Sequence, residues 1–201
     1  MNNKLKILAI SDTHGDSRLV KKLAIKADQE EVNAILLCGD IVGWRETKDI
    51  IAPLIKKDRP LLFIPGNHED VSITEELISR YNLVNMHGQS LKIGEVGIFG
   101  IGGADLLPGF VSEKTIYSEL VKSHSIIKDS RKKVLMTHMH PKDSKSEFSG
   151  IEGSNAIKRI IEKFSPDIVL HGHIHEAAGF EERWNNTRIV NVGRKGFIFE
   201  I

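Results

Sequence analysis

Short apolar runs that alternate with longer amphipathic stretches restrict the fold of this chain more than any other feature of its sequence. The runs are rich in β-branched and aliphatic residues and are too short for buried helices, so they predict buried strands. They lie at 5–10, 34–38, 61–64, 96–101, 133–137 and 167–171. Strands that alternate with helices along 201 residues indicate an α/β sandwich with a mixed sheet.

The amphipathic stretches predict three helices, in which apolar residues recur every three or four positions. These helices are expected at 17–31, 113–129 and 155–164, with capping residues at Ser17 or Asp16, at Ser112 and at Ser154. Pro53 lies inside the less regular stretch 46–58, so any helix there begins shortly before this proline or kinks at it. The final part, 179–201, is predicted to be extended at 188–192 and at 197–201.

Composition favours one soluble domain and argues against several classes of partner. With 28 basic and 27 acidic residues the net charge is +1, so neither duplex nucleic acid nor a membrane is expected as a partner. No apolar run approaches the roughly 18 residues of a membrane span. The single cysteine, Cys38, lies in an apolar run and is predicted to be a core residue rather than a reactive thiol. We therefore expect a single domain over 1–201 and a cytoplasmic location, while the oligomeric state stays open.

Five short polar motifs stand where apolar runs end. Each follows a predicted strand: Asp12-Thr13-His14, Gly39-Asp40, Gly66-Asn67-His68-Glu69, His138, and Gly172-His173-Ile174-His175. Ligand sites of α/β proteins gather at the carboxyl ends of strands, so five such clusters can converge on one crevice. Each motif alone is weak evidence, because similar short sequences form turns and helix caps. Their joint occurrence predicts a metal site.

The residue types in these motifs suit a transition metal. They combine carboxylate and amide oxygens with imidazole nitrogens, a set suited to Mn, Fe, Zn, Ni or Co, of which we favour Mn. A site for Mg or Ca would use oxygen ligands and would not need four histidines. The predicted ligands are Asp12, His14, Asp40, Asn67, His138, His173 and His175. Seven ligands are too many for one tetrahedral site but suit two divalent ions that share a bridging carboxylate.

The five motifs, in this order, resemble the signature of the calcineurin-like metallophosphoesterase superfamily, D-x-H, G-D, G-N-H-[D/E], H and G-H-x-H. They extend from Asp12 to His175, so the resemblance covers nearly the whole chain. It implies an α/β fold, a four-layer αββα sandwich with two mixed β-sheets flanked by helices, and a binuclear metal centre. Glu69 replaces the commoner Asp, a mild change. Asn191-Val192-Gly193 stands where many compact members resemble Asn-Pro-Gly-Ser, which leaves the subfamily open.

The resemblance also implies a role for each motif residue. One metal would be held by Asp12, His14, Asp40 and His175. Asp40 would bridge to a second metal, completed by Asn67, His138 and His173. His68 would be catalytic rather than a ligand and would face the substrate phosphate beside Asn67, with Glu69 supporting it.

The expected reaction is hydrolysis of a small phosphodiester or phosphomonoester, with a nucleotide as one candidate, by in-line attack of a hydroxide held at two metals. His68, as an imidazolium oriented by Glu69, would donate a hydrogen bond to the phosphoryl group or protonate the leaving oxygen. Two alternatives stay open: a non-catalytic metal-binding scaffold of the same fold, and a nucleotide pyrophosphatase or dinucleoside polyphosphate hydrolase. The intact ligand positions favour an enzyme.

Three further residues are candidates for substrate contact. Trp44 and Arg45 follow the second motif and are suited to stack on a base or pair with a phosphate, although packing under a loop is an equal alternative. His140 lies just beyond the fourth motif and is either a substrate contact or a solvated loop histidine. The stretches 102–112 and 139–153 are rich in Gly, Ser and charge, which is typical of functional loops.

Overall fold

The computed structural model describes residues 4–43, 49–105 and 109–201, which form two β-sheets packed face to face. The first sheet consists of β11 (Phe197–Glu200), β1 (Lys6–Ile10), β2 (Ala34–Cys38), β3 (Leu61–Ile64) and β4 (Val84–Asn85), in that order. The second consists of β5 (Gln89–Ile93), β6 (Val96–Ile101), β7 (Lys132–Thr137), β8 (Ile168–His171), β10 (Thr187–Asn191) and β9 (Glu181–Trp184). Both are mixed: the first sheet has one antiparallel pair, β11 with β1, and the second has antiparallel pairs at both edges, whereas the other pairs are parallel.

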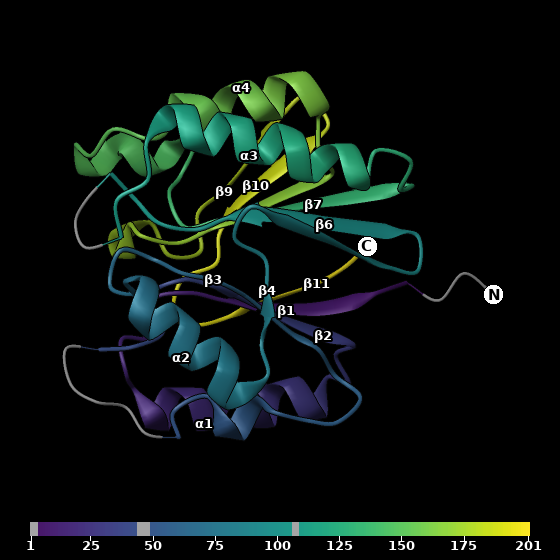
Figure 1. The fold of residues 1–201 in the computed structure, drawn as a ribbon, viewed down its shortest axis with the longest axis vertical. Coiled ribbons are helices and arrows are strands. Elements are labelled where there is room, and N and C mark those ends of the chain that lie inside the picture. The colour runs from purple at the N-terminus through teal and green to yellow at the C-terminus, as the bar shows by residue number, and fades with distance from the viewer. Residues whose placement is uncertain (1–3, 44–48, 106–108) are drawn as a thin grey trace.

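Helices cover the outer face of each sheet, as Figure 1 shows. The first sheet is covered by α1 (Ser17–Gln29) and α2 (Val71–Tyr81), and the second by α3 (Glu113–Ile126) and α4 (Asn155–Phe164). The described residues also form the short 3₁₀ helices η1 (Ala52–Leu54), η2 (Lys145–Ser149) and η3 (His175–Ala177). The expected four-layer αββα sandwich is confirmed.

Alternating side chains of the strands fill three apolar layers. On β1, Leu8 and Ile10 pack against the α1–α2 layer, whereas Ile7 and Ala9 pack between the two sheets. Cys38 lies in the central layer with no exposed surface, and burial raises the pKa of its thiol. The interpretation of this cysteine as a core residue is therefore confirmed.

Helix starts follow the expected capping chemistry. The side chain of Asp16 accepts a hydrogen bond from the N–H of Leu19 at the start of α1, and Ser112 and Ser154 cap α3 and α4 in the same way. Within the stretch that contains Pro53, η1 begins one residue before this proline, as its missing N–H requires. Across the described ranges, no helix combines the length and apolar character needed to cross a membrane.

The sequence analysis did not predict α2, β4, β5 or β9. Helix α2 buries only Leu77 and Tyr81, so its apolar periodicity is weak. Strand β4 has two residues, and the edge strand β5 is half-buried along most of its length. These elements are stabilised by packing against neighbouring helices and strands. Local sequence patterns do not reveal such packing.

Candidate metal centre

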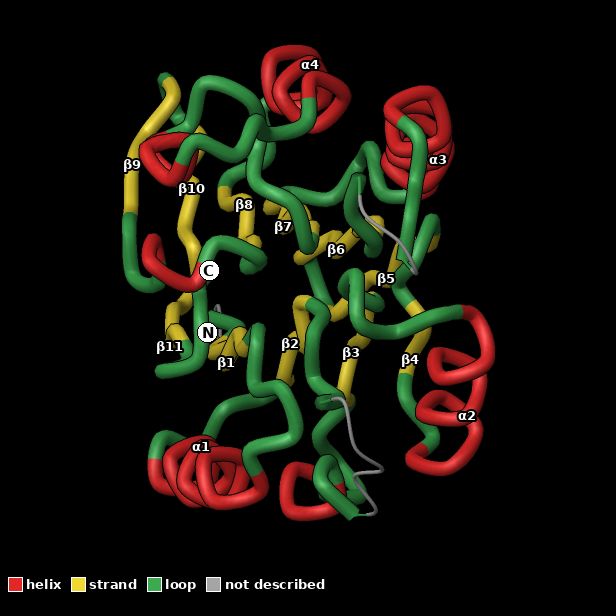
Figure 2. The backbone as a smooth tube through the Cα atoms, turned by 90° about the vertical axis from the view of Figure 1, so that its left-hand side faces the viewer, coloured by secondary structure: helices red, strands yellow, loops and turns green. Residues whose placement is uncertain are grey.

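The five polar motifs meet at one edge of the sandwich, which Figure 2 faces. Three of them follow β1, β2 and β3 in the first sheet, and two follow β7 and β8 in the second. Backbone contacts join these loops within and between the sheets. The N–H of Asp12 donates to Gly39 O at 3.0 Å, and the N–H of His173 donates to the Asp12 carboxylate at 3.1 Å. Side chains that lie up to 161 positions apart in sequence are thereby neighbours.

The buried carboxylate of Asp40 lies at the centre of the cluster. Its Oδ2 atom is 3.5 Å from His138 Nε2 and 3.8 Å from the Nε2 atoms of both His14 and His68. Its Oδ1 atom accepts a hydrogen bond of 2.9 Å from the N–H of His68. One carboxylate oxygen therefore faces imidazoles from three different loops.

Two smaller groups of donor atoms flank Asp40. On one side, Asn67 Oδ1 lies 3.1 Å from His138 Nε2 and 3.0 Å from His173 Nδ1. On the other side, His175 Nε2 lies 2.9 Å from His14 Nε2 and 3.6 Å from Asp12 Oδ1. All seven predicted ligand residues thus lie in one cluster.

Three overlapping sets of these side chains could each hold a metal ion, because their ligand atoms lie within 4.8 Å of one another. The sets are Asp12, His14 and His175; His14, Asp40 and His68; and Asp12, Asp40 and His138. Geometry therefore also admits His68, which the sequence analysis placed outside the ligand set. Carboxylate oxygens and imidazole nitrogens that converge in this way fit a divalent transition metal.

Several of the same residues have a strained backbone. Four of the seven predicted ligands have positive φ: Asp12 (57°), His14 (45°), Asp40 (53°) and His173 (71°). Side chains with a Cβ rarely adopt this left-handed region, and such conformations cluster at functional sites, where the surrounding structure enforces them. The fold thus uses strained turns to direct these four side chains inward.

Two motif glycines are required by close packing around the carboxylates. A Cβ on Gly66 would lie 2.1 Å from Asp40 Oδ1, and a Cβ on Gly172 would lie 1.9 Å from Ser11 Oγ and 2.4 Å from Asp12 Oδ2. Any larger residue would displace the carboxylates. The glycines of the G-N-H-E and G-H-x-H motifs therefore allow neighbouring loops to approach closely.

Charge in the cluster is unevenly distributed. Burial alone would lower the pKa of His138, but the neighbouring Asp40 carboxylate raises it to about 9. Burial also opposes ionisation of Asp12 and Asp40, yet their histidine partners lower the pKa of both carboxyl groups. Burial lowers the pKa of His14, and it lowers that of His173 to about 4. The ionised carboxylates of Asp12 and Asp40 and the uncharged rings of His14 and His173 suit a cation, whereas His138 must lose a proton before its Nε2 binds one.

Glu69 has a set of contacts that the sequence did not reveal. Its buried carboxylate accepts hydrogen bonds from four backbone N–H groups, those of Asp40, Ile41, Val42 and Gly66, at 2.7–2.9 Å. It therefore fastens the loop after β2 to the loop after β3. The support of His68 by Glu69 stays a prediction. Because these contacts are made to backbone N–H groups, any such support would act through the backbone of the two loops.

Other candidate residues have different outcomes. His140 is fully buried and its Nε2 lies 3.2 Å from Ile151 O, so the expectation of a solvated loop histidine is wrong. Trp44 and Arg45 lie outside the described residues. Asn191, to which the sequence analysis gave no role, donates from Nδ2 to Ile174 O at 2.8 Å and so anchors the G-H-x-H loop. The signal available in the sequence was its position at the end of an apolar run.

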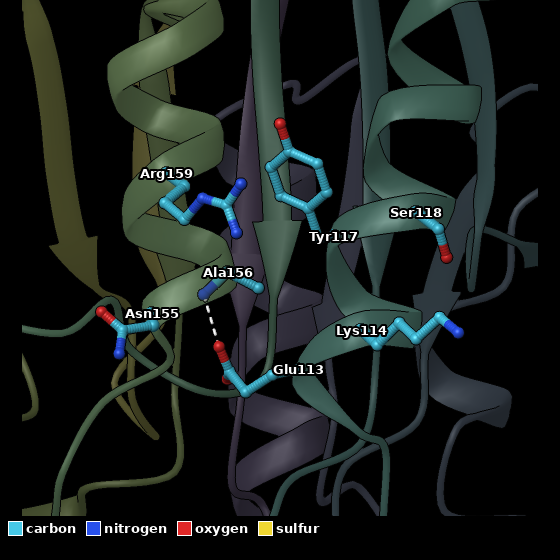
Figure 3. A pocket seen from close by; sticks show the side chains of 7 residues that line it. All are labelled: Glu113, Lys114, Tyr117, Ser118, Asn155, Ala156 and Arg159. Atoms are coloured by element: carbon cyan, nitrogen blue, oxygen red, sulfur yellow. Dashed lines mark hydrogen bonds between the residues drawn. The ribbon is translucent and has the colours of Figure 1, made fainter.

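A groove on the outer helical layer is distinct from the metal-binding groups (Figure 3). Its lining consists of Glu113, Lys114, Tyr117, Ser118, Asn155, Ala156 and Arg159. The carboxylate of Glu113 accepts from the N–H of Ala156 at 2.5 Å, and the Arg159 guanidinium lies 4.2 Å above the Tyr117 ring. These polar groups contact one another and hold α3 against α4.

A two-sheet sandwich that gathers buried carboxylates and imidazoles at one edge has the architecture of a metallohydrolase. The sequence matches the calcineurin-like phosphoesterase family over residues 5–177. The chain belongs to this family and is a hydrolase that acts on phosphoester bonds, which confirms the resemblance drawn from its motifs.

Solved structures show the same fold at low sequence identity. Protein TT1561 of Thermus thermophilus superposes with a TM-score of 0.74 at 18% identity, covering 98% of this chain and 99% of that chain. A dimetal phosphatase from Danio rerio gives 0.60 at 12% identity, covering 93% and 86%. A novel archaeal phosphodiesterase gives 0.56 at 16% identity, covering 98% and 99%. Among curated proteins, none matches this sequence.

Proposed function

We propose that this phosphoesterase hydrolyses a small phosphodiester or phosphomonoester with two divalent metal ions, Mn being the favoured element. The observation that carries the proposal is the position of Asp40 Oδ2 among three imidazoles, 3.5–3.8 Å from each Nε2 atom. An oxygen with donor groups on both sides suits a bridging carboxylate. The first ion would be held by Asp12, His14, Asp40 and His175, and the second by Asp40, Asn67, His138 and His173.

The donor set supports this division. Asn67 Oδ1 lies 3.1 Å from His138 Nε2 and 3.0 Å from His173 Nδ1. In the other group, the Nε2 atoms of His14 and His175 are 2.9 Å apart. When bound, two such ions supply a hydroxide at neutral pH and neutralise charge that develops on the phosphoryl oxygens. The carboxylates of Asp12 and Asp40 offset the positive charge of the ions.

His68 is proposed to act on the substrate rather than as a ligand. Its ring lies beside that of His14, with centroids 4.7 Å apart, and its side chain is partly exposed at the edge of the cluster. From this position it would donate a hydrogen bond to a phosphoryl oxygen or a proton to the leaving oxygen. Asn67 would orient the phosphoryl group beside it. Glu69 would support both residues by fixing the turn that begins at Gly66.

A small substrate agrees with the charge of the chain. A net charge of +1 provides no general attraction for duplex nucleic acid. A cytoplasmic location stays a prediction.

The test is a metal-reconstitution assay. Protein stripped with a chelator is reloaded with Mn, Ni, Zn or Mg and assayed with bis-p-nitrophenyl phosphate, p-nitrophenyl phosphate, cyclic nucleotides and dinucleotides. We expect hydrolysis that returns on reloading. We also expect His68→Ala to retain both ions and lose most of the turnover. Asp40→Asn should lose both metal binding and turnover. Tight metal binding without hydrolysis of any of these compounds would instead identify a non-catalytic scaffold.

A further inference from the structure

Exposed phenylalanines lie at the edge that carries the metal-binding groups. Among the described phenylalanines, three are exposed: Phe110 (56%), Phe148 (59%) and Phe180 (42%). Phe110 follows Gly109, whose Cα packs so closely on Asn67 that an added Cβ would lie 2.7 Å from the Asn67 Cα. Phe180 lies just beyond η3, which begins with His175. Large apolar side chains are costly to expose, and their concentration beside a site points to ligand contact.

Phe148 and Phe180 form a pair. Their ring centroids are 5.3 Å apart with an angle of 35° between the planes, and neither ring belongs to the three apolar layers of the fold. The two rings come from different loops, because Phe148 is part of η2 and Phe180 follows η3. These two 3₁₀ helices pack against each other.

Backbone contacts hold both loops in place. The N–H of Phe180 donates to Ala177 O at 2.8 Å, and Phe180 O accepts from the N–H of Asn191 at 3.0 Å. The N–H of Lys145, at the start of η2, donates to Glu182 Oε1 at 2.7 Å. The aromatic pair is therefore preorganised, which reduces the entropy lost when a ligand binds.

The pair includes a residue of the loop that carries a proposed metal ligand, because Phe180 follows η3 (His175–Ala177). His175 begins η3, its side chain is 50% exposed, and its Nε2 reaches the donor group that contains His14 and Asp12. A phosphoryl group held there would bring any planar group attached to it near the two phenylalanine rings. Stacking between bases and aromatic side chains accepts any base, because every base has a π-face.

We propose that Phe148 and Phe180 form a stacking platform that selects phosphoesters carrying a nucleobase. This inference rests on the proposed function, since that function places the phosphoryl group at two metal ions, one of which His175 would hold. It makes the two phenylalanines specificity-determining residues and defines the substrate class as nucleotides rather than phosphosugars or alkyl phosphates.

The experiment compares AMP with ribose 5-phosphate on Mn-loaded protein by isothermal titration calorimetry. The two compounds share the 5′-phosphate and ribose and differ by the base. We expect AMP to bind at least about 10-fold more tightly to the unmodified protein, as stacking on an aromatic side chain provides. In Phe148→Ala/Phe180→Ala the two dissociation constants should agree within about twofold. If either compound is hydrolysed, the ratio of kcat/KM replaces the ratio of dissociation constants.

Three control variants isolate the effect. Phe148→Leu/Phe180→Leu keeps apolar bulk without rings and should lose most of the preference for AMP, whereas Phe180→Trp should keep it. Ile126→Ala removes an exposed apolar side chain at the end of α3 and should leave the ratio unchanged. Circular dichroism establishes that each variant is folded.

The outcomes separate this inference from the function on which it rests. A preference for AMP that depends on the two rings, in a protein that hydrolyses nothing, would retain the platform and reject the catalytic proposal. Hydrolysis with a ratio near one, or with a ratio unchanged in the double variant, would overturn the platform. A change from dimer to monomer in the double variant, at unchanged ratio, would overturn it too and identify a contact between copies of the chain.

Discussion

The Nδ1 atom of His138 lies 2.9 Å from the carbonyl oxygen of Cys38. A carbonyl oxygen accepts hydrogen bonds and cannot donate them, so Nδ1 carries a proton. In the neutral ring the lone pair is then on Nε2, which faces Asp40 and Asn67. Cys38 is the last residue of β2, and its side chain is buried between the two sheets. The central core therefore fixes both the orientation and the tautomer of a proposed metal ligand.

His138→Ala should remove the second of the two proposed ions. We expect elemental analysis to find about one ion per chain where the unmodified protein has about two, as the proposed ligand division requires. Hydrolysis should fall by at least about 100-fold, since loss of even an outer partner of a metal ligand costs about 10–100-fold. His124→Phe, in helix α3, is the matched control and should retain both ions. Two ions in His138→Ala would show that the assignment of this ligand is wrong.

Glu69→Gln should destabilise the fold although it changes few atoms. The carboxylate accepts four backbone N–H groups, whereas a glutamine amide has one oxygen and would turn its NH₂ group against some of these donors. We expect the free energy of unfolding to fall by about 2–4 kcal/mol, because buried donors are left without acceptors.

Urea denaturation measures this loss for Glu69→Gln, and Glu95→Gln provides the comparison. Glu95 is an exposed glutamate whose ion pair with Arg131 is 3.2 Å long, so its replacement should cost less than about 0.5 kcal/mol. Equal effects of the two substitutions would contradict the structural role of the Glu69 contacts.

The elements that the sequence predicted are those with strong local patterns. Helix α4 concentrates its buried residues on one stripe and has a serine cap, so periodicity and capping agree. Helix α2 buries two residues and gains its order from the sheet beneath it. The difference is physical, because tertiary packing stabilises elements whose own sequence favours them only weakly.

In the site, too, the sequence predicted features that depend on local motifs and missed contacts between segments that are distant in the sequence. The identity and order of the motif residues predicted which side chains converge, because strand ends share an edge. Contacts made to backbone N–H and C=O groups, such as those of Glu69 and Asn191, have no counterpart in residue patterns, because every residue carries the same backbone groups. The pairing of Phe148 with Phe180 likewise depends on two loops whose distance the sequence does not specify.

Glu113→Ala should loosen the contact between α3 and α4. The Glu113 carboxylate accepts from the N–H of Ala156 in the first turn of α4, where N–H groups lack partners within the helix (Figure 3). We expect a loss of about 0.5–2 kcal/mol in the free energy of unfolding, the usual range for removal of a helix N-terminal acceptor. Glu113→Gln retains an acceptor oxygen and should lose less. Unfolding curves that coincide for all three proteins would exclude this contribution.

His124 should make the stability of the protein depend on pH in the acid range. Its ring stacks on Phe164, with centroids 3.8 Å apart, and approaches Phe99 edge-on. Among the described residues its buried Nε2 has no hydrogen-bond partner, so a charge there would be poorly solvated. Burial first, and then the positive charges of Lys133 and Lys163, lower the pKa of His124.

The sign of this effect follows from proton uptake. Below its ordinary pKa of about 6.5, the unfolded chain protonates this histidine while the folded protein resists protonation. The unfolded state then binds more protons, so the contribution of His124 to stability is present at neutral pH and is lost as the pH falls below about 6.5. His124→Phe keeps the aromatic stack and removes the titration. Denaturation at about pH 5 and about pH 8 should show the variant gaining stability over the unmodified protein on acidification. Since every other group titrates alike in the two proteins, a difference in stability that stays constant with pH would mean that the folded state accommodates the charged ring.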